Sequence, residues 1–378
     1  MLPSSAAAVL EDGDLASEIL LRLPPQPSSL PRASAVCKSL RSVASDPGFS
    51  RRFRIHHRRS RPLLGFFMGA GNELRFEPTL DPPNRVPQGR FQFPIDASDR
   101  SFKLLGCRHG FLLMLRTFQG TVQLLVWDPF NGHEHRLAIP PGFDKKQING
   151  AVLRAAPGVG DIDHFQVVLV STDVQQGVVA CVYSSETAWG NLIATPLPSW
   201  GKIDPSRPAV LVRDSLYMLL LGIGGPSRIV EFDVGKQSLA VIPLPASFDY
   251  GYGRSCFYSV MRADGGGLGM VFVSAPGGSA QLWKRITNYD GVASWVLART
   301  IELDKLISHS LKSQCCLHIT GLAEENNVVF LWSGFGVFMV QLDSLQFKRL
   351  PLTTMHRWHP FESVYAAGNS MPSFTMLG

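Results

Sequence analysis

The chain has 378 residues, of which 45% are hydrophobic and only 17% are charged. This composition supports a large buried core and excludes a chain that is disordered throughout. The length exceeds that of one small domain and falls short of three, so we expect two unequal domains. The 35 glycines and 27 prolines favour many short strands joined by tight turns over a helical protein.

The net charge of +6 has a local origin. Six of the 36 basic residues are arginines between Arg51 and Arg61, where no acidic residue occurs; the rest balance the 30 acidic residues. A neutral body argues against a broad nucleic-acid-binding face. We interpret the basic run as a solvated linker between domains, with nuclear import as an alternative. Nucleic-acid binding is least favoured, because only Phe53 interleaves with the arginines.

The six cysteines are widely spaced and form no Cys-x-x-Cys pair. This pattern predicts reduced thiols rather than a zinc site or a disulfide framework. We expect no signal peptide, because the apolar stretch from Ala6 to Leu10 is short and Glu11 follows it. No apolar run reaches the length of a membrane span. We therefore expect no membrane partner and a location in the cytoplasm, the nucleus or both.

The first part of the chain carries helical periodicity after a flexible tail that we place at residues 1–9. Asp12 or Asp14 can cap a first helix, and Pro24-Pro25 ends it. A second helix is predicted from Ser28–Pro31 through Ala44, and a short third helix around Phe49 and Phe53. The first helix carries an apolar stripe, which consists of Leu15, Ile19, Leu20 and Leu23.

A core built from about 44 residues is marginal by itself. Periodicity alone leaves two interpretations equally open: a cap packed on the larger domain, or a docking module that a partner stabilises. The residues themselves favour the second, since residues 10–53 resemble an F-box. The resemblance is carried by Glu18-Ile19-Leu20, Leu23-Pro24, Val36-Cys37-Lys38 and Asp46-Pro47-Gly48-Phe49, which follow the family's order and spacing. Leu10-Glu11-Asp12 replaces the family's opening Leu-Pro, and Leu40 replaces its usual Trp.

The resemblance implies a Skp-type adaptor as a partner, and through it a cullin of a cullin–RING ubiquitin ligase. The four residues of the apolar stripe and Pro24 after them would form the interface, and three later residues would be shared between interface and core. The implied adaptor-binding residues are Leu15, Ile19, Leu20, Leu23 and Pro24, with Val36, Cys37 and Leu40 shared.

After a basic linker at residues 54–62, residues 63–378 show a loose repeat of strand, polar turn and strand. The turns lie at 128–132, 185–187, 233–235, 290–291 and 343–344. A period of roughly 50 residues is that of a four-stranded propeller blade. We predict a mainly β protein, in which the short helical module precedes a β-propeller of about six blades. A large β-sandwich is the alternative.

This region is also similar to the F-box-associated β-propeller common in plant F-box proteins. The VWDP turn at Val126–Pro129, the VYSSET segment at Val182–Thr187 and the LWKR segment at Leu282–Arg285 carry the resemblance in that order. Together the two resemblances imply a substrate-recruiting subunit of an SCF-type ubiquitin ligase, in which the propeller binds an unidentified target protein.

Catalytic patterns are weak. His133-Glu134-His135 follows a turn, Asp161-Ile162-Asp163-His164 precedes a strand, and His356 and His359 have no suitably spaced carboxylate or cysteine. We interpret the first as an exposed polar hairpin and the second as a solvated loop, and we expect no catalytic residue, no metal and no cofactor. The competing hypothesis is a propeller hydrolase or a carbohydrate-binding protein with a helical cap. It requires carboxylates or aromatic side chains that converge in the central channel.

Overall fold

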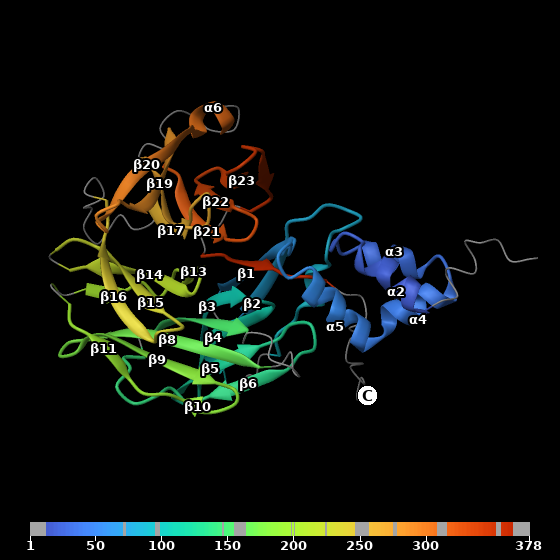
Figure 1. The fold of residues 1–378 in the computed structure, drawn as a ribbon, viewed down its shortest axis with the longest axis horizontal. Helices are drawn as coiled ribbons and strands as arrows, with labels where there is room; N and C mark the ends of the chain where they lie inside the picture. The colour runs from blue at the N-terminus through green and yellow to red at the C-terminus, as the bar shows by residue number, and fades with distance from the viewer. Residues whose placement is uncertain are drawn as a thin grey trace, which may run out of the picture.

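The computed structural model describes most of the chain: residues 13–70, 73–94, 99–145, 147–154, 164–197, 199, 201–223, 225–245, 257–274, 278–307, 316–352 and 357–365. The expected tail at residues 1–9, the cap at Asp12 and the motif at Asp161–Asp163 lie outside these residues. A group of N-terminal helices lies beside six β-sheets that form a ring (Figure 1). The fold is mainly β, as the sequence predicts, and the β-sandwich alternative is wrong.

Four short helices build the N-terminal part: α2 (Gly13–Leu21), α3 (Ser29–Ser34), α4 (Lys38–Ser45) and α5 (Pro47–His56). The prediction of one helix from Ser28 through Ala44 is wrong, because the chain breaks it at Cys37. Cys37 is extended (φ −153°) and caps α4, where its Sγ accepts the Leu40 N–H at 3.5 Å. Asp46 caps α5 in the same way, with its carboxylate accepting the Phe49 N–H at 2.6 Å.

Each sheet is one propeller blade, and we number the blades along the chain. Blade 1 joins β1 (Leu63–Ala70) and β2 (Glu73–Pro78) with β25 (His359–Glu362). Blade 2 contains β3 (Asp99–Arg108), β4 (Phe111–Phe118), β5 (Thr121–Trp127) and β6 (Glu134–Leu137). Blade 3 contains β7 (Asn149–Arg154), β8 (Phe165–Asp173), β9 (Gly177–Ser184), β10 (Ala188–Trp189) and β11 (Ile193–Thr195).

Blade 4 contains β12 (Gly201–Ile203), β13 (Val210–Val212), β14 (Ser215–Gly222), β15 (Arg228–Asp233) and β16 (Ser238–Pro243). Blade 5 contains β17 (Tyr258–Arg262), β18 (Leu268–Val273), β19 (Ser279–Thr287) and β20 (Ala293–Glu302), and the short helix α6 (Leu303–Ile307) follows it. Blade 6 contains β21 (His318–Ala323), β22 (Val328–Ser333), β23 (Gly336–Gln341) and β24 (Phe347–Leu350).

The five turns predicted from the repeat each follow the third strand of a blade, counted outwards from the axis, and precede its outer strand. They join β5 to β6, β9 to β10, β15 to β16, β19 to β20, and β23 to β24. Blade 1 shows no such turn because it is assembled from the first and the last strands of the propeller: β25 pairs antiparallel with β1. This pairing closes the ring between the first and the last strands of the propeller.

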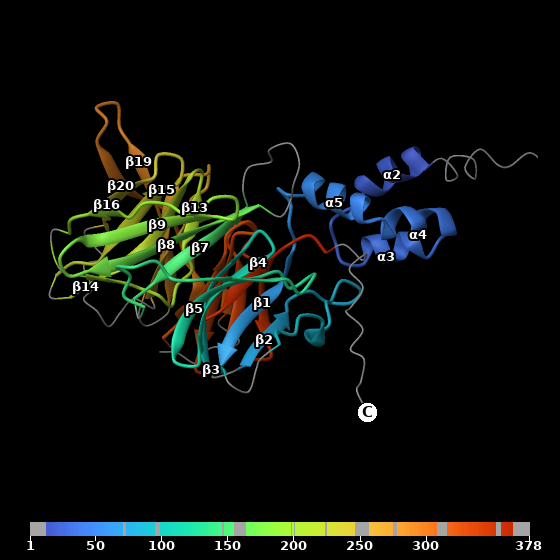
Figure 2. The same cartoon turned by 90° about the horizontal axis from the view of Figure 1, so that it is seen from below.

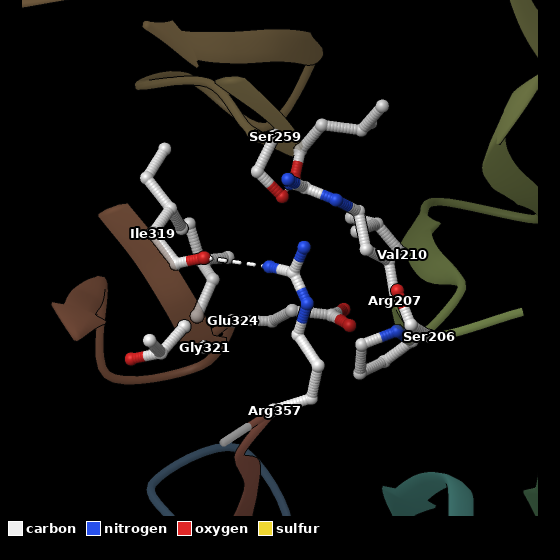
Figure 3. Close-up of a pocket in the computed structure, with 12 residues that line it drawn as sticks. Ser206, Arg207, Val210, Ser259, Ile319, Gly321, Glu324 and Arg357 are labelled. Carbon is white, nitrogen blue, oxygen red and sulfur yellow. Dashed lines mark hydrogen bonds between the residues drawn. The ribbon is translucent and has the colours of Figure 1, made fainter. Parts of the chain in front are cut away.

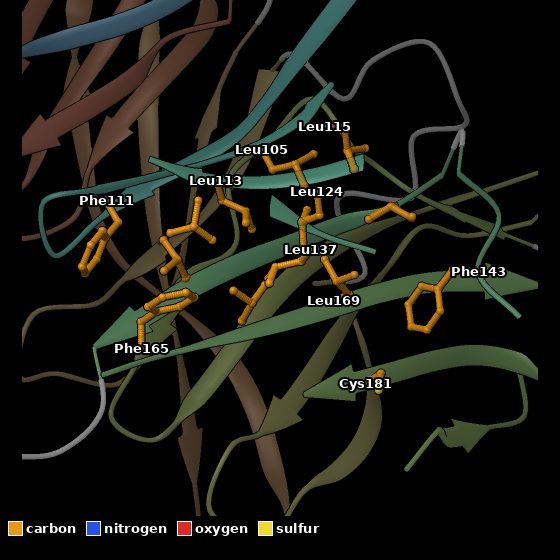
Figure 4. Packing of buried hydrophobic residues seen from close by; sticks show 14 of the residues in the cluster. Leu105, Phe111, Leu113, Leu115, Leu124, Leu137, Phe143, Phe165, Leu169 and Cys181 are labelled. Carbon is orange, nitrogen blue, oxygen red and sulfur yellow. The ribbon is translucent and has the colours of Figure 1, made fainter. Parts of the chain in front are cut away.

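Hydrophobic cores lie between adjacent blades (Figure 4). Successive side chains of a strand point to opposite faces, and β4 uses both. Leu113 and Leu115 pack with blade 3, whereas Leu112 and Met114 pack with blade 1. This double burial explains why the inner strands read as continuous apolar runs rather than as an alternating pattern.

Contacts between described residues connect the helices to the propeller besides the chain itself. The Ser28 hydroxyl donates to the Asn84 side-chain oxygen at 2.7 Å, and the Ser28 N–H donates to the same atom at 3.2 Å. Val364, which follows β25, is buried in the helical core. The helical module is therefore held against blade 1, where the first and the last strands of the propeller meet.

Candidate functional site

Helix α2 divides its apolar side chains between two faces. Ala16 and Leu20 are buried, with exposures of 0% and 1%, whereas Leu15 and Ile19 are exposed at 42% and 41%. Residues four apart lie on one side of a helix, so each pair shares a face. One face therefore forms the core of the module, and the other presents two large aliphatic side chains to solvent.

The remaining residues expected at the adaptor interface also divide. Val36 is exposed at the α3–α4 junction, and Pro24 is exposed after α2. Leu23 and Cys37 are partly buried against the core, and Leu40 is buried. The eight residues thus form an exposed set (Leu15, Ile19, Pro24 and Val36), an intermediate set (Leu23 and Cys37) and a buried set (Leu20 and Leu40). We call the exposed set the apolar surface.

The core beneath the apolar surface is small but closed. It consists of Ala16, Leu20, Leu21, Leu30, Leu40, Ala44, Phe49, Phe53 and Val364. His57 completes it from the end of α5: a ring nitrogen (Nε2) lies 2.9 Å from the Leu21 carbonyl oxygen, at the C-terminus of α2. Burial lowers the pKa of this histidine, and the Leu21 carbonyl opposes that shift. Sequence reasoning missed Val364 because it lies more than 300 residues from the helices.

The arginine run does not act as one unit. Arg51, Arg52 and Arg54 lie on α5, and the Arg52 guanidinium donates to the Ser17 hydroxyl at 2.9 Å. Arg61 reaches blade 6 instead, where its guanidinium pairs with Glu325 at 2.5 Å. Part of the run is thus structural, while Arg58 and Arg59 are exposed.

The central channel of the propeller contains charged side chains (Figure 3). Arg108 of β3 donates to Glu324, which follows β21, with one Nη1–Oε2 distance of 2.9 Å and a second bond through Nη2. Arg108 also donates to the Ala209 carbonyl of blade 4 at 2.8 Å. Arg357 donates to the Ile319 carbonyl at 2.7 Å. These bonds tie inner strands of different blades together across the axis.

A second group of polar residues lies where the ring closes. Glu362 of β25 accepts hydrogen bonds from the N–H groups of Glu325 and Asn326, at 3.0 and 2.7 Å, and from the Asn326 side-chain amide at 2.8 Å. The same amide donates to the Arg61 carbonyl at 2.9 Å. Burial raises the pKa of Glu362 to about 7, against the opposing effect of Asn326. The cluster joins blade 6, β25 and the segment that enters β1.

Carboxylates thus converge in the channel, as the hydrolase hypothesis requires, but they are already bonded within the protein. The two cavities beside them have a volume of about 20 Å³ each, which is room for roughly one water. In the described part of the chain, His, Cys, Asp and Glu side chains form no group of three or more that suits a metal ion. Among the same residues, no helix combines the length and apolar character needed to cross a membrane.

The histidine motifs noted in the sequence take separate places. In the first, Glu134 pairs with Arg136 at 3.5 Å, and the His135 ring packs on Phe165 with centroids 4.9 Å apart. His359 is buried in β25, while His356 lies outside the described residues. Sequence reasoning missed Arg108, Glu324 and Glu362, since each reads as an ordinary polar residue at the end of a strand.

These features define a β-propeller protein whose helical module presents an apolar surface. The model of a family described as F-box protein AT5G49610-like, beta-propeller matches residues 103–365, and the F-box domain model matches residues 14–52. The chain therefore belongs to the family of F-box proteins that carry this propeller.

A curated relative is the "Putative F-box protein At3g16210" of Arabidopsis thaliana, which is 24% identical over 235 residues. The match covers 61% of this chain and 60% of the relative, so the chain spans about three fifths of the relative's length.

Solved structures also resemble the chain at low identity. The WD40 domain of SCAP from fission yeast is 12% identical with a TM-score of 0.36, over 68% of this chain and 56% of that one. The periplasmic gluconolactonase PpgL of Pseudomonas aeruginosa is 11% identical with a TM-score of 0.39, over 75% and 81%. We draw no functional conclusion from either.

Proposed function

We propose that this chain is the substrate-recruiting subunit of an SCF-type cullin–RING ubiquitin ligase. The F-box docks to a Skp-type adaptor, the adaptor connects it to a cullin, and the propeller binds a target protein. The observation that carries the proposal is the exposure of Leu15 and Ile19 on one face of α2, above a core that is closed without them.

This exposure favours a docking module over a simple cap. A cap would place its outward aliphatic side chains against the larger domain, because burial removes their contact with water. Among the described residues, the module instead contacts the propeller through residues such as Ser28 and Val364, while Leu15 and Ile19 on the outer face of α2 stay exposed. An exposed apolar surface on a folded domain is typical of a protein interaction site.

The eight residues implied by the F-box resemblance would act in two ways. Leu15, Ile19, Pro24 and Val36 would contact the adaptor directly, and large apolar side chains at the centre of such an interface contribute most of the binding energy. Leu20 and Leu40 would hold α2 and α4 in place, with Leu23 and Cys37 at the boundary.

The mechanism requires no catalytic residue in this chain. Holding a target beside the ligase raises the effective concentration of its lysines near the ubiquitin-loaded enzyme. The bonded carboxylates and small cavities of the channel are consistent with a structural role for the propeller axis.

The test is co-expression of the full chain with a Skp-type adaptor, followed by size-exclusion chromatography and calorimetric titration. We expect wild type to co-elute with the adaptor, and Leu15→Asp/Ile19→Asp to bind at least ~100-fold more weakly, since each hot-spot residue contributes about 2 kcal/mol or more. The matched control is Ile55→Asp, because Ile55 is exposed at 44% but lies beyond the residues matched by the F-box model. Undiminished adaptor binding by the double variant would refute the proposal.

A further inference from the structure

The outer strand of blade 5 differs from the other outer strands. It is the ten-residue β20, which forms a long hairpin with β19. Figure 2 shows this hairpin projecting beyond the neighbouring blades. Within the described residues β20 pairs with no strand other than β19, so its second edge offers free backbone groups.

The other blades protect their outer edges. β2 alternates Glu73, Arg75 and Glu77, whereas β6 and β24 are four residues long and charged. β10 and β11, which both pair with β9, have two and three residues. β16 is uncharged but ends at Pro243, whose carbonyl accepts the Trp295 indole N–H at 2.9 Å. Short length, charge and proline are the usual means by which proteins prevent pairing at a sheet edge.

β20 has none of these protections over its central part, which reads Trp295-Val296-Leu297-Ala298. Val296 and Leu297 are exposed at 37% and 44%, and successive strand residues point to opposite faces of the hairpin. The other exposed apolar side chains of the hairpin are Ile286, Tyr289 and Val292. An added strand would therefore find apolar neighbours on both faces.

The hydrogen bonds of the hairpin show which backbone groups are free. The Asn288 N–H donates to the Val292 carbonyl at 3.0 Å, so these residues form a hydrogen-bonded pair. Bonded and non-bonded pairs alternate along an antiparallel ladder, and Thr287 pairs with Ala293 in the next position. Ala293, Trp295 and Leu297 therefore direct their N–H and C=O groups away from β19, which is the pattern that an additional strand requires.

Charge distinguishes among extended partners. Between Lys284 and Arg299 the hairpin has three basic residues, and Asp290 is its one acidic residue. A second copy of this chain would bring an equal positive charge to the same edge, which opposes pairing between copies. A segment with acidic residues would be attracted instead.

We propose that the free edge of β20 binds an extended, apolar segment of the target protein that carries acidic residues, by adding it as a strand to blade 5. Backbone hydrogen bonds provide the affinity in this mode, and the flanking side chains provide the selectivity. The inference rests on the proposed function, since it assigns the surface on which that function recruits its target.

The experiment selects a phage-displayed library of random twelve-residue peptides on the full chain bound to its adaptor. We expect enrichment of sequences that alternate apolar residues and contain Asp or Glu. A synthetic peptide from this selection should bind Val296→Lys/Leu297→Lys at least ~10-fold more weakly than wild type. The control Phe335→Lys/Phe347→Lys changes side chains of similar exposure (39% and 43%) on blade 6, and it should bind as wild type does.

Two further measurements test the mode of binding. Methylation of alternate backbone nitrogens in the peptide should abolish binding if the peptide forms a strand, whereas an ordinary apolar contact would tolerate it. Equal binding by both double variants, or tolerance of methylation, would overturn the inference. Self-association of wild type that is lost in Val296→Lys/Leu297→Lys would replace the target segment with a second copy.

The failure of this inference is distinguishable from the failure of the proposed function. Adaptor binding depends on α2 and should be unchanged in the β20 variants, whose folding is checked by thermal denaturation. If adaptor binding is intact but the peptide binds the β20 variants and the control equally, only the role of β20 is rejected. If the adaptor binds Leu15→Asp/Ile19→Asp as tightly as wild type, the F-box proposal is rejected.

Discussion

The helical module and the propeller use apolar residues in opposite ways. Helix α2 buries Ala16 and Leu20 but leaves Leu15 and Ile19 in water. Strand β4 buries Leu112, Leu113, Met114 and Leu115 on both of its faces. The difference follows from size: four short helices can enclose one small core, whereas a ring of blades covers both faces of each central strand.

The comparison shows where binding surfaces can form without loss of stability. A module with one closed core keeps a second helix face available for a partner. Such a small module is, however, only marginally stable by itself. In the propeller, surface that a partner could use is confined to an outer edge such as that of β20, because the faces of the inner strands are covered on both sides.

Charged residues show the reverse distribution. Arg58 and Arg59, which follow α5, are exposed, whereas the Arg108 and Glu324 side chains along the propeller axis are only 11% and 10% exposed. Buried charges persist only where they are paired and hydrogen-bonded. The propeller axis satisfies this condition because inner strands from several blades meet there and supply donors and acceptors to one another.

The largest effect is expected from truncation of the module core. Phe53→Ala should lower the free energy of unfolding of the module by about 3–5 kcal/mol, because it removes a fully buried aromatic ring from a core of few residues. Scanning calorimetry should show loss of a helical transition and an unchanged propeller transition. The control Phe232→Ala, which truncates a fully buried ring between blades 3 and 4, should lower the midpoint temperature of the propeller transition instead. If Phe53→Ala lowers the midpoint temperatures of both transitions, the two regions form one cooperative unit.

The next effect tests the charged axis. Arg108→Met should lower the free energy of unfolding by about 3–5 kcal/mol, because the Glu324 side chain, which is only 10% exposed, then loses its guanidinium partner. The double variant Arg108→Met/Glu324→Gln should recover at least half of this loss, as measured by urea denaturation. Additive losses in the double variant would contradict the view that the pair, rather than each side chain separately, stabilises the axis.

The smallest effect concerns pH. Burial lowers the pKa of His359 to about 3, with Arg357 and Lys103 acting in the same direction. The unfolded chain takes up a proton at this histidine near pH 6.5, whereas the folded chain stays neutral until pH 3. The contribution of His359 to stability is therefore complete above pH 6.5 and decreases as the pH falls towards 3.

At pH 5.5 the loss from this histidine should be about 1.4 kcal/mol relative to pH 7.5. His359→Gln should reduce the difference in unfolding free energy between these two pH values by that amount. His133→Gln, at an exposed turn, serves as the control and should leave the difference unchanged. A wild-type pH dependence that persists in His359→Gln would show that other groups cause it.

Local patterns in the sequence determined the elements of this protein. The Asp-rich turns recur at a blade-sized interval, and the spacing of Leu15, Ile19 and Leu20 defines an amphipathic helix, because turns and helix faces depend on residues within a few positions of each other. The F-box motifs are equally local. The same information predicted one helix from Ser28 through Ala44 where the structure has α3 and α4, and it failed there because a cysteine cap leaves little trace in hydrophobic periodicity.

The tertiary structure alone decided which of these residues remain exposed and which distant residues meet. Ile19 and Leu20 are adjacent and equally apolar, but only packing against α4 and α5 places one in water and the other in the core. The pairing of β25 with β1, the burial of Val364 among the helices and the Arg108–Glu324 bond each join residues more than 200 positions apart. Such contacts depend on closure of the whole ring, and for that reason no local pattern could predict them.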